Sequence, residues 1–400
     1  MGGVYSSNLG FGIWDLGFMR IAFLIWDYSP SRGGQERYLS RLVGALLTRG
    51  HEIHVFATRC EAGLSPRIAF HRVAVSGWGP SLKTLSFLRK AREMLARERF
   101  DVVSGMTRFY PIDVYRMGSG VHKVWMRLKA DRALGRRVSY LRPFNWLVLR
   151  LERAIFDPAH CRHIIANSEL CRRQLLDLYR YPAERVTVVY NGVDHGYFHP
   201  RLRDEHRVGV LNRLGLPLDR PVAIFVSNNL KRKGLDTVIR ALALVRDGRP
   251  SLLVAGGGRT ARHIALAHRQ GLAARIRFLG RVADVRPYYG ASDFLALPTR
   301  YDPFANVCLE AMACGLPVIT TRDNGAAEII HEGTDGFILA DPGDARALAH
   351  RIATLSDEGT RAPIAAAARE KSLGFTIERN AEGTLAVYRA IQEERHGHPL

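Results

Sequence analysis

The stretch that decides the fold is Tyr301-Asp-Pro-Phe-Ala-Asn-Val-Cys-Leu-Glu-Ala-Met-Ala-Cys-Gly-Leu-Pro-Val-Ile-Thr320. It predicts a short helix closed by Gly315 and Pro317, because glycine caps helix ends and proline cannot continue a helix. One apolar strand is expected before the helix, at 294–297, and another after it, at 318–320. This order places the helix start at the carboxyl edge of a parallel sheet, where its dipole and amides favour an anion.

Working outward, the same alternation of strands and helices continues along the chain in two series. Near-continuous apolar strands that alternate with helices favour an α/β protein with doubly wound parallel sheets. Residues 199–220 are polar and rich in turn formers, so we expect a connecting segment there. The first series predicts strands at 21–26, 52–57 and 100–103 and helices at 35–49 and 82–98; the second predicts strands at 222–226, 251–254 and 276–279.

These series divide the chain into two Rossmann-like domains of similar size that join near residue 190. We expect the first domain at 19–190 and the second at 191–380, followed by a C-terminal helix and tail at 381–400. Residues 1–18 look like an upstream extension, because a strand begins directly after Met19 and no signal-peptide pattern precedes it.

Composition narrows the classes of partner. The 5 cysteines are scattered, which indicates neither a disulfide framework nor a zinc site and fits a reducing cytoplasm. A net charge of +20 would attract nucleic acid, an anionic membrane or phosphorylated small molecules. No apolar run approaches the roughly 20 residues that are needed to span a bilayer.

A glycine pair, Gly33-Gly34, separates the first expected strand from the first expected helix. Glycine lets the backbone approach a phosphate at a helix N-terminus. The pair does not complete a GxGxxG pattern, so it does not indicate a dinucleotide site. A tight turn with positive φ would use the same residues.

The basic run Lys231-Arg-Lys-Gly234 follows the first strand of the second series. Arginine can fork across two phosphate oxygens, and lysine can act as a point charge beside them. The run could therefore clamp a diphosphate across a cleft from Gly33-Gly34. A solvated basic loop would have the same composition.

Two acids stand in the opening stretch, Asp302 in the loop and Glu310 in the helix. The neighbours of Glu310 are small and apolar, and an ionised carboxylate in such surroundings needs partners. The helical residues between the two acids span about 12 Å, roughly the length from a ribose across two phosphates to a hexose. Two simpler explanations stay open: Asp302 before Pro303 fits a plain N-cap, and Glu310 could be a surface residue.

In this order and at these spacings the motifs resemble the retaining GT-B glycosyltransferases of family 4, from about Met19 to the C-terminus. The resemblance implies a nucleotide diphosphate sugar, such as a UDP-sugar, as the donor, and neither a metal nor another cofactor. The motifs that carry it are Arg32-Gly-Gly34, Asn167-Ser-Glu169, Asn191-Gly-Val-Asp194 with Phe198, Arg232-Lys-Gly234, Phe278-Leu-Gly280, the Asp302 to Glu310 block, Glu328, Gly333 and Gly336.

The resemblance also implies donor-binding roles. Gly33 and Gly34 would approach the diphosphate or the sugar, while Arg232 and Lys233 would neutralise the diphosphate leaving group. Glu310 would hold the ribose hydroxyls. The remaining implied contacts are Asp302 with the donor sugar, the amides of Asn306, Val307 and Cys308 with the phosphates, and the backbone near Arg281 with the base.

The chain departs from the family pattern at two positions. The first member of the acidic pair is usually glutamate and is Asp302 here, which could change the donor hydroxyl that is bound. The frequent glycine after the Pro-Phe pair is Ala305 here, which bears on close backbone approach at that point.

The family places a histidine or an acid near the reacting sugar, after a strand of the first domain. The candidates are His122, which follows Met117-Gly-Ser-Gly-Val, and Asp113. A structural histidine is the alternative for His122. Retaining enzymes of this fold often show no protein nucleophile, so catalysis would rest on positioning and leaving-group stabilisation.

Residues 116–153 form a basic segment in which aromatic and aliphatic side chains are interleaved. Ten lysines and arginines oppose only Asp131 and Glu152. This mixture suits an anionic membrane surface, although a solvated basic face with core anchors would look similar. No nucleic-acid motif accompanies it, so nucleic acid is not an expected partner. The segment resembles the insertion of lipopolysaccharide-core glucosyltransferases, whose acceptor is lipid-anchored.

The sequence thus predicts a hexosyltransferase at the cytoplasmic face of the membrane that acts on a lipid-linked glycan. Two alternatives share the scaffold. A nucleotide-sugar epimerase would need no acceptor, and a membrane-bound protein with a degenerate site would bind no nucleotide diphosphate.

Overall fold

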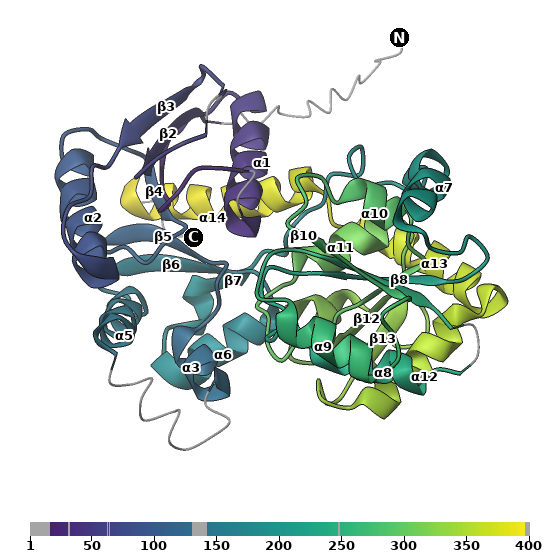
Figure 1. Ribbon diagram of the computed structural model, residues 1–400. Coiled ribbons are helices and arrows are strands. Elements are labelled where there is room, and N and C mark those ends of the chain that lie inside the picture. The colour runs from purple at the N-terminus through teal and green to yellow at the C-terminus, as the bar shows by residue number, and fades with distance from the viewer. Residues whose placement is uncertain are drawn as a thin grey trace, which may run out of the picture.

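Two parallel sheets, each covered by helices, lie side by side in the computed structural model (Figure 1). The structure describes residues 17–30, 33–61, 63, 65–129, 142–246 and 249–396. Nearly all of the expected extension 1–18, the centre of the basic segment 116–153 and Arg32 lie outside the described residues. The α/β class and the two Rossmann-like halves that the sequence predicts are both present.

The first sheet has seven parallel strands in the order β3-β2-β1-β4-β5-β6-β7. Along the chain, the first domain contains β1 (Arg20–Leu24), α1 (Gly34–Thr48), β2 (Glu52–Ala57), β3 (Ile68–Arg72), α2 (Gly79–Leu95), β4 (Val102–Gly105), β5 (Ile112–Met117), α3 (His122–Lys129), α5 (Pro143–Ile155), β6 (Cys161–Ala166), α6 (Glu169–Tyr179), a 3-10 turn (Ala183–Arg185) and β7 (Val186–Val188).

The second sheet has six parallel strands in the order β10-β9-β8-β11-β12-β13. Along the chain, the second domain contains α7 (Leu202–Leu214), β8 (Val222–Val226), α8 (Leu235–Leu244), β9 (Ser251–Ala255), α9 (Ala261–Arg269), β10 (Ile276–Gly280), α10 (Arg286–Gly290), β11 (Phe294–Ala296), α11 (Asn306–Ala313), β12 (Val318–Thr321), a 3-10 turn (Gly325–Ile329), β13 (Gly336–Leu339), α12 (Ala345–Ser356) and α13 (Glu358–Leu373). Helix α14 (Ile377–His396) follows them.

Strand β1 shows why the sheets form from apolar runs. Ile21 and Phe23 pack into the core beneath α1, whereas Ala22 and Leu24 pack into the core beneath α2 and α5. A strand that is buried on both faces requires apolar residues at successive positions, which is typical of a parallel sheet with helices on both sides.

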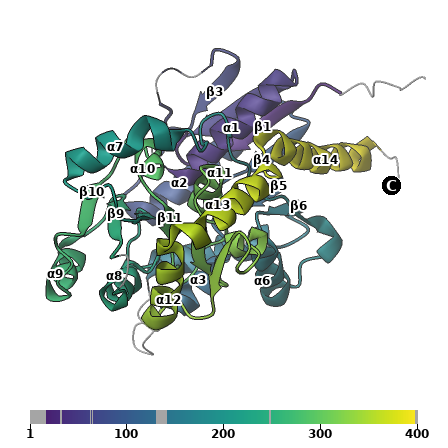
Figure 2. The same cartoon turned by 90° about the vertical axis from the view of Figure 1, so that its right-hand side faces the viewer.

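The last helix, α14, returns from the second domain to the first. Figures 1 and 2 show it beside α1 and β4, and its Leu385, Tyr388 and Ile391 belong to the core of the first domain. The Tyr388 hydroxyl donates to Ser104 Oγ over 2.8 Å. Two segments therefore link the domains, and they touch where Val193 N–H donates to the Phe375 carbonyl.

The structure differs from the sequence-based expectation at 199–220, where helix α7 occupies most of the predicted connecting segment. Its buried side chains are Leu202, Val210 and Leu211, which pack on the second core. These three apolar residues are too few for a clear helical stripe. No helix among the described residues is both long and apolar enough to cross a membrane.

Candidate active site

A cleft with a volume of about 830 Å³ separates the two domains. The first domain contributes the start of α1 and the end of β5 to its lining, and the second domain contributes the loops after β8, β10 and β11 with the start of α11. Loops at the carboxyl ends of parallel strands are the usual ligand-binding edge of such sheets. Nine of the expected donor-binding residues line the cleft: Gly33, Gly34, Arg232, Lys233, Arg281, Asp302, Asn306, Val307 and Glu310.

The basic run and Asp302 form one charged cluster in this cleft. Lys233 is buried, and its Nζ lies 2.5 Å from Asp302 Oδ2. Arg232 Nη1 lies 3.1 Å from the same carboxylate oxygen. Two cations share one carboxylate, so the cluster keeps one positive charge and suits a polyanionic group. This arrangement is not the solvated basic loop that the composition also allowed.

Gly234 fixes the position of this cluster at the start of α8. Its φ is +82°, in the left-handed region that favours glycine. A Cβ there would lie only 2.1 Å from the Pro298 carbonyl oxygen, so a side chain would push α8 away from the loop after β11. The close approach brings Lys233 to Asp302.

Asp302 does not cap α11, contrary to one explanation from the sequence. The N-cap of α11 is Ala305, which has no side-chain cap. Asn324 supplies the acceptor there, because its Oδ1 receives the Ala305 N–H over 3.1 Å. Asp302 instead accepts from the Phe304 N–H and from the two basic side chains. Its carboxylate is therefore a partner of the cationic cluster.

The first turn of α11 opens toward the cleft at Asn306 and Val307. Cys308 does not line the cleft, and its N–H donates to the Ala305 carbonyl over 2.9 Å. Its side chain is fully buried, and burial raises the pKa of the thiol to about 12. The Cys308 amide is thus already bonded inside the helix, and its expected phosphate contact stays a prediction.

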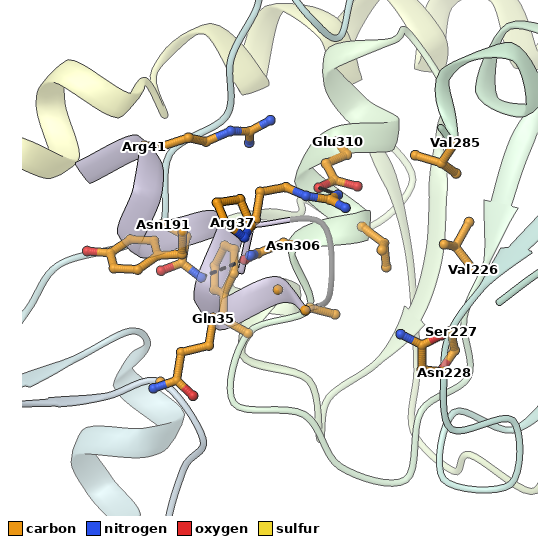
Figure 3. A pocket seen from close by; sticks show the side chains of 18 of the residues that line it. Gln35, Arg37, Arg41, Asn191, Val226, Ser227, Asn228, Val285, Asn306 and Glu310 are labelled. Carbon is orange, nitrogen blue, oxygen red and sulfur yellow. Dashed lines mark hydrogen bonds and ion pairs between the residues drawn. The ribbon is translucent and has the colours of Figure 1, made fainter. Parts of the chain in front are cut away.

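Glu310 is buried at the cleft wall and is not a surface residue. The Tyr289 hydroxyl donates to its Oε2 over 3.1 Å, and Arg37 Nη1 of α1 lies 3.9 Å from Oε1. Figure 3 shows Arg37 and Glu310 facing each other across the domain boundary. Burial and the neighbouring Glu310 charge raise the pKa of Tyr289, so this hydroxyl remains a donor.

Gly33 and Gly34 lie opposite α11, at the start of α1. Gly33 has φ −157°, which is extended backbone, so the positive-φ turn is not the reason for this glycine. A Cβ at Gly34 would lie 4.0 Å from Asn306 Nδ2 of the second domain. The Gly34 backbone therefore lies close to the α11 start, while the expected approach of the pair to the donor diphosphate or sugar stays a prediction.

A polar network joins the two domains at the cleft wall. Asn191 Nδ2 donates to Asn306 Oδ1 over 2.6 Å, and Arg116 Nη2 donates to Asn191 Oδ1 over 2.6 Å. The Arg116 guanidinium lies 4.1 Å from the centre of the Tyr38 ring, whose hydroxyl donates to Asn380 of α14. Burial lowers the pKa of Arg116.

Several further candidates for a functional role line this cleft, chiefly Arg37 and Asn380, and the sequence does not indicate them. An arginine in an expected helix gives no local signal, and Asn380 reaches the cleft only because α14 returns to the first domain. Asn191 did carry a signal, because its Asn-Gly turn follows a strand directly.

The two candidates for a catalytic role in the first domain do not line the cleft. Asp113 stands at the opposite end of β5, where it accepts from the Val103 N–H and pairs with Arg395. His122 is the first residue of α3, and its N–H donates to Glu152. The role of either residue near the reacting sugar stays a prediction.

The two parallel-sheet domains with a cleft between them have the architecture of the GT-B fold, and comparison with known proteins agrees. Residues 32–197 match the family model described as Glycosyltransferase Family 4. Residues 220–358 match the one described as Glycosyl transferases group 1. The chain therefore carries one domain that is similar to each of these two glycosyltransferase models.

Named relatives are similar to the chain over different lengths. A D-inositol 3-phosphate glycosyltransferase of Salinispora arenicola is 33% identical over 247 residues, which cover 58% of this chain and 55% of the relative. The chain thus spans about half of the length of this relative. The enzyme of the same name from Thermobispora bispora is 27% identical, with 91% of each chain covered.

Solved structures confirm the GT-B fold. WaaG, a glycosyltransferase involved in lipopolysaccharide biosynthesis, superposes with a TM-score of 0.79 at 21% identity and covers 92% of this chain and 99% of its own. Anabaena Alr3699/HepE, solved in complex with UDP and glucose, gives 0.69 at 22% identity over 94% of this chain and 99% of its own.

Proposed function

We propose that this protein is a retaining hexosyltransferase that moves a sugar from a nucleotide diphosphate sugar to a lipid-linked glycan. One observation carries the proposal. The cationic pair Arg232 and Lys233, which shares the Asp302 carboxylate, stands beside the open start of α11, and the buried Glu310 lies further along the same helix.

The donor would lie along α11. The diphosphate would replace part of the Asp302 contact with Arg232 and Lys233 and would accept from the first-turn amides of Asn306 and Val307. The Glu310 carboxylate would accept from the ribose hydroxyls, because Tyr289 already orients it. The loop at Arg281, which lies beside Asn228 on the second-domain wall of the cleft, would hold the base. A UDP-sugar is the proposed donor, in keeping with the UDP complex of the Anabaena structure.

Catalysis in this proposal rests on the leaving group. The bond from the anomeric carbon to the diphosphate oxygen would break, and the acceptor hydroxyl oxygen would bond to that carbon on the same face and pass its proton to the departing diphosphate. The cationic cluster stabilises the negative charge that develops on the diphosphate. Because Arg232, Lys233 and the α11 dipole supply positive charge there, we propose that transfer needs no metal ion. Transfer that is undiminished by EDTA would support this step, and full loss with recovery on added Mg²⁺ would contradict it.

The acceptor would approach from the first domain at the inner face of the membrane. The described part of the basic segment shows exposed apolar side chains among its cations: Leu128 is 41%, Phe144 39% and Trp146 59% exposed. Such a surface binds anionic lipid headgroups. A lipid-linked glycan such as a lipopolysaccharide core suits this surface, and WaaG has a related role.

One experiment tests the proposal. Purified protein is incubated with a panel of nucleotide sugars and with membrane lipid extract, and nucleotide diphosphate release is followed. We expect release from a UDP-sugar only when extract is present, with loss of release in Lys233→Ala, and a product whose anomeric configuration matches that of the donor by NMR. A free epimer without extract, or no nucleotide bound at all, would contradict it.

A further inference from the structure

The cationic cluster is in contact with the basic segment through one aromatic side chain. Trp125 of α3 lies under the Arg232 guanidinium, whose central carbon is 5.7 Å from the ring centre. The same guanidinium donates to the Tyr301 carbonyl over 3.1 Å and reaches Asp302. Arg232 is thus held by two residues of its own domain and by one residue of the other domain.

Helix α3 is fixed in place by a buried carboxylate. Glu152 of α5 accepts from the N–H groups of His122 and Lys123, the first two residues of α3. It also accepts from the Tyr179 hydroxyl over 2.6 Å and pairs with Arg108 at 3.3 Å. Because Glu152 is only 1% exposed, these contacts hold the start of α3 firmly on α5.

The loop that carries Tyr301 and Asp302 rests on the same part of the first domain. The Tyr301 hydroxyl donates to Gln174 of α6 over 2.9 Å, and Ser168 Oγ donates to the Pro303 carbonyl over 2.7 Å. A Cβ at Gly120, just before α3, would lie 2.4 Å from the Tyr301 hydroxyl. The α3 start and the Asp302 loop therefore fit together without room for a further side chain.

We propose that Trp125 is a positioning residue for Arg232, so that stabilisation of the diphosphate depends on how α3 of the first domain is seated. This inference rests on the proposed function, and it adds a coupling between the basic segment and the diphosphate site. The segment that we assign to the lipid acceptor would orient the residue that neutralises the leaving group. An aromatic face beneath a guanidinium attracts the cation through the ring quadrupole and limits its directions.

Titration of UDP by calorimetry tests the coupling. We expect Trp125→Leu to weaken UDP binding about threefold to tenfold, the size expected for one cation–π contact, and Trp125→Phe to restore most of it. The matched control is Trp78→Leu, which alters a tryptophan of the same domain that is 94% exposed and should leave UDP binding unchanged. Equal binding by the Trp125→Leu variant and the wild type would overturn the proposal.

A double-mutant cycle separates this inference from the proposed function. If Trp125 acts through Arg232, Trp125→Leu should have no further effect in the Arg232→Ala background. A full, additive effect there would overturn the inference while leaving the proposed function intact. If Arg232→Ala alone binds UDP as the wild type does, the diphosphate site itself is wrong.

A fluorescence measurement with conservative variants avoids reliance on the folding of Trp125→Leu. UDP should change the tryptophan emission of the wild type, because it neutralises the guanidinium above Trp125. The change should disappear in Trp125→Phe and persist in Trp78→Phe. Persistence in both variants would contradict the proposed contact.

Discussion

At the scale of single residues, Asp302 has a different role from the helix cap that its sequence context allows. Its carboxylate balances Lys233, whose side chain is 7% exposed. Asp302→Asn would leave that ammonium buried without its counter-ion, a change that costs about 3 kcal/mol of folding free energy. We expect a lower melting temperature and a larger stabilisation by UDP than in the wild type, because the diphosphate replaces the lost charge. Equal stabilisation by UDP in both proteins would contradict this role.

Glu310 gives a second prediction at the residue scale. Glu310→Gln keeps the shape of the side chain but removes the charged acceptor for the ribose hydroxyls. A hydrogen bond to a charged group contributes about 1.5–3 kcal/mol, so donor binding should weaken by about tenfold to a hundredfold. Donor titration with Tyr289→Phe as the control should show a much smaller loss. Unchanged donor affinity in Glu310→Gln would remove the assigned role.

At the scale of elements, the local sequence predicted the strands that are continuous apolar runs, but not a buried strand that carries charged residues. Strand β5 carries Asp113 and Arg116 within six residues, so its sequence lacks an apolar run, although all six are buried. Each charged side chain has a partner that is distant in the sequence: Asp113 pairs with Arg395, and Arg116 donates a hydrogen bond to Asn191. Such partners are set by the fold and leave no trace in the local sequence.

The packing of helix α14 is likewise set by the fold and not by the local sequence, and this helix yields a third prediction. The helical pattern of the tail was readable, but its packing on the first domain depends on contacts that span most of the chain. Leu385→Ala should destabilise the protein by about 2–5 kcal/mol, because it opens a cavity in the first-domain core. Leu373→Ala, at a position 41% exposed, is the matched control for denaturant unfolding. Similar small losses in both variants would show that α14 is not part of that core.

The cleft was predictable where its residues follow strands of the second domain, as Lys233 and Glu310 do. The first-domain side was predictable only at Gly33-Gly34. Arg37, Arg116 and Asn380 enter the cleft through tertiary packing, which no spacing rule describes.

At the scale of the whole molecule, stability should fall below pH 6.5. His51 is 3% exposed, and its ring nitrogens have no hydrogen-bond partner among the described residues. Burial, with Arg389 and Arg49 nearby, lowers the pKa of His51 from 6.5. The unfolded chain therefore takes up a proton first as the pH falls, and stability is lost through that window.

Thermal unfolding between pH 7.5 and 5.5 checks this prediction. His51→Met should flatten the dependence, whereas His331→Gln, at a side chain 67% exposed, should not. If the melting temperature depends on pH equally in His51→Met and in the wild type, His51 is not the source of the stability loss.

We propose above all that the cleft between the domains holds a nucleoside diphosphate through the cationic cluster and Glu310. The most direct measurement is calorimetric titration of UDP into the wild type, Lys233→Ala and Glu310→Gln, with folding checked by circular dichroism. We expect one binding site in the wild type and binding at least tenfold weaker in each folded variant. Equal UDP affinity in all three proteins, or no binding by the wild type, would contradict it.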